Sequence, residues 1–197
     1  MPTRPGFQIA RFFGIPIYVD PSWIFVFALI TYSLGTQFTQ LHPHWTTAQH
    51  WMLGVLTSLL FFASVILHEL GHSVVAQHYK IRVVSITLFL FGGVARIARD
   101  PSKAIEEFNI AIAGPIVSAL LAGGFYSLTL LLPKHEMTGA LADWLWQTNL
   151  ALALFNLLPG FPLDGGRIFR AIVWGITRIS SRPLAWPARA ARWSPTP

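Results

Sequence analysis

The chain has 197 residues, of which 53% are hydrophobic and only 11% are charged. This composition provides too little polar surface to cover a water-soluble globule, so it excludes an ordinary soluble domain and favours a lipid-facing exterior. Cysteine is absent, which excludes disulfide frameworks and thiolate metal sites.

The N-terminal residues contain no apolar run ahead of a small-residue cleavage site, so they do not have the form of a secretory signal peptide. We interpret residues 1–21 as an N-terminal cytoplasmic segment. Residues 22–166 are predicted to form a membrane core, and residues 167–197 a basic C-terminal segment. We therefore expect one domain over residues 1–197.

Three long stretches contain no Lys, Arg, Asp or Glu, namely residues 21–68, 108–133 and 144–163. Helices of about 20 apolar residues are long enough to cross a bilayer core. A turn around Pro43 divides the first stretch into two. The sequence thus predicts four membrane helices, over Ser22–Phe38, Trp51–Gln77, Ala104–Leu132 and Leu141–Leu158.

Residues 81–97, between the second and third predicted helices, favour extended structure. They are rich in β-branched and aromatic side chains, and Gly92-Gly93 permits a tight turn. We predict a small membrane-associated β-hairpin that packs against protein, because a strand edge facing lipid is costly. The expected fold class is an all-α membrane protein, a polytopic bundle of about four transmembrane helices with this hairpin and a C-terminal cytoplasmic amphipathic helix after Gly166.

The charge distribution orients the predicted helices. With the N-terminus in the cytoplasm, 13 of the 14 basic residues lie in inside segments, and only Lys134 lies outside. This asymmetry follows the positive-inside rule and predicts a multi-pass protein of the cell membrane with both termini cytoplasmic. It also explains the net charge of +6 without nucleic acid as a partner.

The strongest chemical signal is the sequence His68-Glu69-Leu70-Gly71-His72, near the end of the second predicted helix. Histidines at i and i+4 share one helical face and can bind one zinc ion, and Glu69 can act as general base toward a water there. Alternatively, these are polar helix residues satisfied by neighbouring helices. Ionisable residues inside a bilayer cost about 2.5 to 3.5 kcal/mol each even on the lenient insertion scale, which favours the zinc site.

A catalytic zinc site needs a third protein ligand and an open position. His78 has the spacing of the third histidine in the pattern H-E-x-x-H-x-x-G-x-x-H, but Val75 occupies the glycine position. If the helix continues, His78 lies about 240° further round than His72 and faces away. We therefore expect His78 not to bind the metal.

Asp164 is the better candidate for the third ligand. Pro159 and Pro162 end the fourth predicted helix, so Asp164 is expected on irregular backbone that can bend back toward the bundle. His72 and Asp164 both fall toward the cytoplasmic side, close to basic segments. The alternative role for Asp164 is that of a turn residue or an ion-pair partner for Arg167.

At this point the chain resembles the site-2 protease family of intramembrane zinc metalloproteases, in its prokaryotic form. Three stretches carry the resemblance: H-E-L-G-H at 68–72, A-G-P at 113–115 and N-L-L-P-G-F-P-L-D-G-G at 156–166. The resemblance implies one Zn²⁺ per chain, bound by His68, His72 and Asp164. It also implies Glu69 as the catalytic base and Asn156 as a residue near the substrate; the alternative for Asn156 is a hydrogen bond between helices.

The implied function is hydrolysis of peptide bonds within or near the transmembrane segment of membrane protein substrates, in the prokaryotic cell membrane. The strand Val83–Phe91 could pair with an extended substrate segment. Many similar prokaryotic proteins continue into further membrane helices and a pair of CBS domains, whereas this chain stops at Pro197, as a minimal core or a truncated form would.

Two rival functions stay open. One is a membrane protein that binds or transports zinc, but such a protein has no need for a non-ligating base such as Glu69. The other is an inactive protease relative that binds membrane helices. The presence of the whole candidate zinc set argues against lost chemistry.

Overall fold

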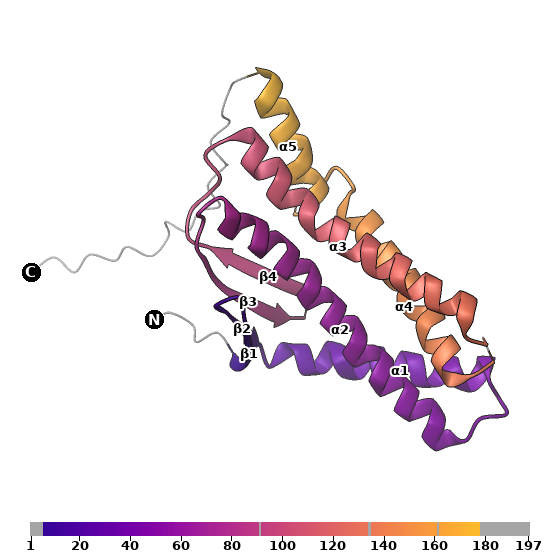
Figure 1. The fold of residues 1–197 in the computed structure, drawn as a ribbon. Helices are drawn as coiled ribbons and strands as arrows, with labels where there is room; N and C mark the ends of the chain where they lie inside the picture. The colour runs from indigo at the N-terminus through magenta and orange to yellow at the C-terminus, as the bar shows by residue number, and fades with distance from the viewer. Residues whose placement is uncertain (1–5, 91, 134, 161, 178–197) are drawn as a thin grey trace, which may run out of the picture.

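The computed structural model describes residues 6–90, 92–133, 135–160 and 162–177, and these form a helical bundle with a small sheet (Figure 1). The elements in chain order are β1 (Phe7–Phe12), β2 (Ile15–Val19), α1 (Ser22–Leu41), α2 (Thr47–His78), β3 (Val83–Phe89), β4 (Gly92–Ile97), α3 (Ala104–Leu131), α4 (Met137–Asn156) and α5 (Asp164–Thr177). The protein is therefore mostly helical, as predicted, but it is not all-α.

All four helices predicted for the membrane are present. Among the described residues, α1, α2 and α3 are long and apolar enough to cross a bilayer. The 20-residue α4 carries Asp143, Gln147 and Asn149 and does not qualify by the same measure. The structure thus supports a membrane protein with three candidate spans, and a fourth span stays a prediction.

The long helix α2 begins four residues earlier than predicted because a capping box fixes its first turn. The Thr46 side chain accepts a hydrogen bond from the Gln49 backbone N–H, and the Gln49 side chain accepts one from the Thr46 N–H. The resulting 32 residues span about 48 Å at 1.5 Å per residue, more than a bilayer core of about 30 Å. The helix is therefore longer than membrane crossing requires.

The predicted hairpin is confirmed as the antiparallel pair β3–β4, but it is half of a four-stranded sheet with the order β1-β2-β3-β4. The interpretation of residues 1–21 as a simple cytoplasmic segment misses β1 and β2. β2 forms because Ile15 and Ile17, two residues apart, are fully buried in a core with Leu70 of α2 and Ile110 of α3. The largely exposed β1 is held by its antiparallel pairing with β2.

The strand order overturns one expectation about substrate binding. β3 is paired on both sides, in parallel with β2 and antiparallel with β4, so it has no edge to offer a substrate strand. The sheet has its edges at β1 and β4, and it lies beside the C-terminal half of α2 (Figure 1). A hydrogen bond from the Ala95 N–H to Glu69 joins the edge strand β4 to α2, the helix that carries the histidine pair.

The predicted amphipathic helix is α5, but it begins at Asp164 rather than after Gly166. Of the basic C-terminal segment, residues 178–197 lie outside the described part of the chain. Residues 157–163 separate α4 from α5, as the two prolines predict.

Helices α1 and α2 approach closely at two glycines. A Cβ atom at Gly54 would lie 3.1 Å from the backbone oxygen of Thr31 and from the backbone nitrogen of Gly35. Close approach at small residues is a common way for membrane helices to pack. This contact holds α1 against the helix that carries the histidine pair.

We predict that Gly54→Leu destabilises the protein by about 1 to 3 kcal/mol, because the new side chain overlaps backbone atoms that cannot move independently. Gly124→Leu in α3 is the matched control, since a Cβ atom there meets nothing within 4 Å. Thermal unfolding in detergent measures both. Equal melting temperatures for the two variants would contradict the close α1–α2 contact.

Candidate metal centre

The structure brings together the three predicted metal ligands. His68 and His72 lie one turn apart on α2, and Asp164 is the first residue of α5. The two Nε2 atoms are 3.2 Å apart, and each is 3.1 Å from Asp164 Oδ2. Tetrahedral zinc with bonds of about 2.0 to 2.1 Å would place its ligand atoms about 3.3 Å apart, so this triangle fits such an ion.

The other ring nitrogen of each histidine forms a hydrogen bond with α3, and this contact orients the imidazole. His72 Nδ1 lies 2.7 Å from the backbone oxygen of Ile110, and His68 Nδ1 lies 2.9 Å from Ser118 Oγ. Since a carbonyl oxygen only accepts, His72 Nδ1 carries the proton and Nε2 keeps its lone pair. Hydrogen bonds of this kind fix the tautomer and orientation of metal-binding histidines.

Helix α3 passes directly behind the two rings at Gly114. Any Cβ atom at this position would overlap His72 Nε2 and would lie 2.6 Å from His68 Nε2. Ile110, Gly114 and Ser118 follow one another at four-residue intervals, so they line one face of α3. On that face, Ile110 contacts His72 and Ser118 contacts His68. Gly114, between them, leaves space for the two Nε2 atoms.

Asp164 reaches the centre from a helix rather than from irregular backbone, which corrects the prediction. The first turn of α5 packs tightly on the end of α4, where a side chain at Gly165 would overlap the carbonyl oxygens of Leu157 and Leu158. One carboxylate oxygen, Oδ2, faces the inner nitrogens of both rings, which is the position of a third ligand to an ion held by the two histidines.

An ion pair fastens α5 to α3. Glu107, which is only 2% exposed, accepts hydrogen bonds from Nε of Arg170 at 2.9 Å and from its terminal nitrogen. The Nε atom of Arg167 approaches the same carboxylate to 4.0 Å. This contact fixes the helix whose first residue is Asp164.

Glu69 lies beside the triangle but does not belong to it. Its Oε2 accepts a hydrogen bond of 3.2 Å from the backbone N–H of Ala95 in β4. A Cβ atom at Gly93 would lie 2.7 Å from Glu69 Cγ, so the second glycine of the pair makes room for this side chain. The sheet edge thus orients the one carboxylate that is free of the metal-ligand group.

His78 lies apart from the other candidates. It is the last residue of α2, it is exposed, and its ring contacts Tyr79 with centroids 5.4 Å apart. It is not in the group of His68, His72 and Asp164, whose ligand atoms lie within 4.8 Å of one another.

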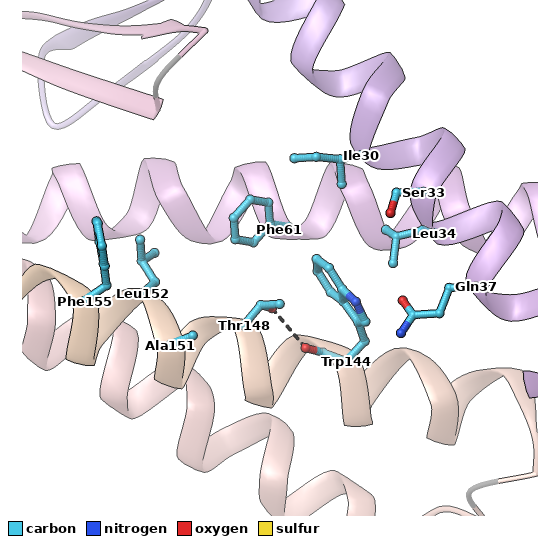
Figure 2. Close-up of a pocket in the computed structure, with 10 residues that line it drawn as sticks. All are labelled: Ile30, Ser33, Leu34, Gln37, Phe61, Trp144, Thr148, Ala151, Leu152 and Phe155. Carbon is cyan, nitrogen blue, oxygen red and sulfur yellow. Dashed lines mark hydrogen bonds between the residues drawn. The ribbon is translucent and has the colours of Figure 1, made fainter.

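A cleft of about 470 Å³ leads away from the centre, past His68 and Glu69 toward Asn156 near the end of α4. The Asn156 amide donates to the backbone oxygen of Leu152 at 2.9 Å. A neighbouring apolar groove of about 490 Å³ runs between α1 and α4, with Phe61 of α2 between them (Figure 2). The groove and the cleft share three lining residues, Ile30, Phe61 and Leu152.

Sequence reasoning missed the residues that support the candidate ligands. Ser118, Glu107 and Arg170 contact them or position them from other elements, and the Ile110 contribution comes from its backbone. The only sequence signal was the A-G-P stretch at 113–115, which marks the correct part of α3.

Comparisons with known proteins agree with this geometry. The profile of Peptidase family M50 matches residues 56–144 and 134–186. The chain is 46% identical, over 94% of its length, to "Putative zinc metalloprotease sll0528" of Synechocystis sp., and 34% identical, over 84% of its length, to "Zinc metalloprotease MJ0392" of Methanocaldococcus jannaschii. The matches cover 48% and 45% of these proteins, so the chain spans about half the length of the curated relatives it matches.

A solved structure is similar as well. The site-2 protease from Methanocaldococcus jannaschii aligns with a TM-score of 0.58 and 32% identity, covering 85% of this chain and 71% of that one.

We predict that Ser118→Ala lowers the affinity for a divalent metal about 10- to 100-fold, because His68 loses the partner that orients its ring. His78→Ala is the control and should leave metal affinity unchanged. Competition with a metal chelator, followed by elemental analysis, measures both. A loss with His78→Ala equal to that of His72→Ala would contradict the proposed ligand set.

Proposed function

The chain belongs to peptidase family M50, and from this premise we propose that it is an intramembrane zinc metalloprotease that cleaves membrane proteins within or near a transmembrane segment. The observation that carries the proposal is the convergence of His68, His72 and Asp164 on one point with Glu69 beside it. Relatives named zinc metalloproteases and a similar site-2 protease structure support the same function.

The proposed cofactor is one Zn²⁺ per chain, held by two imidazoles and one carboxylate. Three protein ligands leave the fourth position of a tetrahedral ion open, as a catalytic site requires. Zinc bound there supplies a lowered pKa for water at the open position and a polarised scissile carbonyl.

Glu69 is the proposed general base. The N–H of Ala95 holds Oε2, so the carboxylate is oriented while Oε1 is left for the attacking water. Glu69 takes the proton of that water and later passes it to the leaving amine. A zinc transporter would not need this orientation, because Glu69 contacts the sheet rather than the ligand triangle.

The apolar groove between α1 and α4 is the proposed path of the substrate. Leu34 and Phe38 of α1 share one buried cluster with Leu53 of α2 and Ala140 of α4. The groove continues along α1 and α4 from Leu34 and Trp144 to Leu152 and Phe155 (Figure 2). The shared residues Ile30 and Leu152 connect the groove to the cleft that reaches the centre. An apolar peptide segment could therefore pass from lipid to the metal without crossing water.

An extended substrate would pair with β4 rather than with β3. β4 is an edge strand, and the Ala95 N–H that binds Glu69 points away from β3. Adding a strand at this edge would present the substrate backbone beside Glu69. Asn156, which lines the same cleft, is proposed to contact the same segment.

We further propose that α4 is a fourth span, that residues 22–166 form the catalytic core, and that both termini are cytoplasmic. The distribution of basic residues supports this orientation. It places the metal centre toward the cytoplasmic leaflet, and the loop between α1 and α2 on the opposite side.

We predict that Glu69→Gln lowers cleavage of a single-span membrane protein by at least about 100-fold while zinc stays bound. Gln keeps the size of Glu but cannot accept the proton of the water. His72→Ala, as the control, should lose both zinc and cleavage. A Glu69→Gln variant that retains zinc and cleaves as fast as the parent would rule out the proposed base.

For the orientation, we expect reporter fusions at Arg11 and Arg192 both to give a cytoplasmic signal, and a reporter in the loop at Pro43 to give the opposite signal. Alkaline phosphatase and green fluorescent protein fusions in bacterial cells make the measurement. An outside signal at either end would refute the proposed orientation.

A further inference from the structure

A second cavity, of about 220 Å³, lies on the His72 side of the metal centre. It shares Glu69, Asp164 and the β4 backbone with the larger cleft, so both cavities open onto the same reacting point. The larger cleft extends among apolar side chains such as Phe61 and Leu152. The second cavity also has apolar walls, at residues such as Ile97 and Ile110, but it adds the polar side chains of Ser73 and Arg167.

The acidic groups of this cavity already have partners. Oδ2 of Asp164 is within 3.1 Å of both imidazoles, and Oε2 of Glu69 accepts from the N–H of Ala95. Among the described residues, neither carboxylate forms an ion pair with Arg167, whose ion-pair partner is Glu107.

The donors of this cavity are less well matched. In the described part of the chain, the Arg167 guanidinium has one ion-pair contact, at 4.0 Å from Glu107, and Arg170 takes the hydrogen bonds of that carboxylate. The buried Ser73 hydroxyl has no hydrogen-bond partner among the described residues. Arg167 and Ser73 therefore offer hydrogen-bond donors that are not fully used within the protein. Such donors complement an acceptor such as a carboxylate.

We propose that this second cavity is a subsite for a carboxylate next to the scissile bond, recognised by Arg167. The proposal rests on the proposed protease function. The carboxylate comes either from an acidic substrate side chain or from the new C-terminus of the first product. Arg167 follows Asp164 by one turn of α5, so the subsite lies at a fixed offset from the metal ligand.

The test of the first source uses a single-span membrane protein that the zinc-loaded enzyme cleaves. Residues flanking its cleavage position are replaced in turn by Asp, Asn, Ala and Lys, and kcat/KM is measured. At one position Asp should be preferred over Ala by about tenfold, as expected for a hydrogen bond to a charged group. Arg167→Met should abolish this ratio, Arg167→Lys should keep part of it, and Arg167→Glu should favour Lys. Lys103, an exposed cation outside the cavity, provides the control: Lys103→Met should leave the preference for Asp over Ala unchanged.

The test of the second source needs no cleavage. Peptides ending at the cleavage position, or apolar peptides of random sequence if no cleavage is found, are prepared with a free C-terminal carboxylate and as amides, and their binding to zinc-loaded Glu69→Gln is measured. A preference of about tenfold for the carboxylate that Arg167→Met removes supports the product source. The subsite would be overturned if kcat/KM were equal across the panel and both peptides bound equally. It would also be overturned if the preference for a carboxylate persisted in Arg167→Met. If no substrate is cleaved but the carboxylate peptide still binds more tightly than the amide in an Arg167-dependent way, the subsite stands and only the protease function is contradicted.

Discussion

One face of α3 determines the geometry of the metal centre. Ile110 and Ser118 hold the outer nitrogens of the two histidines, and Gly114 leaves the space in which their inner nitrogens converge. The i, i+4 spacing on α2 brings the two rings to one face but does not by itself fix their rotation or tautomer. The neighbouring helix supplies both, so an apolar span becomes part of the site through its backbone and one hydroxyl.

The same helix also positions the third candidate ligand, by a different interaction. Glu107 and Arg170 form a nearly buried ion pair that holds α5 on α3, and α5 starts at Asp164. Such a pair is weak evidence for stability, because desolvation offsets much of its attraction, yet breaking it by removing one partner typically costs about 3 to 5 kcal/mol. Its value here is geometric, since it fixes α5 on α3 while Asp164 Oδ2 lies 3.1 Å from the inner nitrogens of both histidines of α2.

Much of this arrangement could be predicted from local sequence. The helix ends differ from the predicted ones by no more than four residues, and the histidine pair follows from helical periodicity. β2 could not be predicted, because its stability depends on the burial of Ile15 and Ile17 against α2 and α3, far along the chain, and β1 depends in turn on its pairing with β2. The role of Ser118, fifty residues from His68, depends on the same kind of non-local packing.

The sheet shows why element prediction alone did not give the edge strand that we propose for substrate binding. A hairpin at residues 81–97 was expected, but only the pairing of β2 with β3 makes β3 internal and leaves β4 as the edge next to Glu69. Strand order is set by contacts between distant segments, and it decides which backbone groups are free to bind a partner. The N-terminal strands therefore influence the site without contacting it.

X-ray absorption spectroscopy at the zinc edge of the purified protein tests the central claim most directly, because it reports the atoms that bind the metal. The account predicts one zinc per chain, with two imidazole nitrogens and oxygen ligands at about 2.0 to 2.2 Å. In Asp164→Ala, the spectrum should lose a protein oxygen ligand while both imidazoles remain. Three imidazoles in the parent spectrum, or a spectrum that Asp164→Ala does not change, would contradict the assignment of His68, His72 and Asp164.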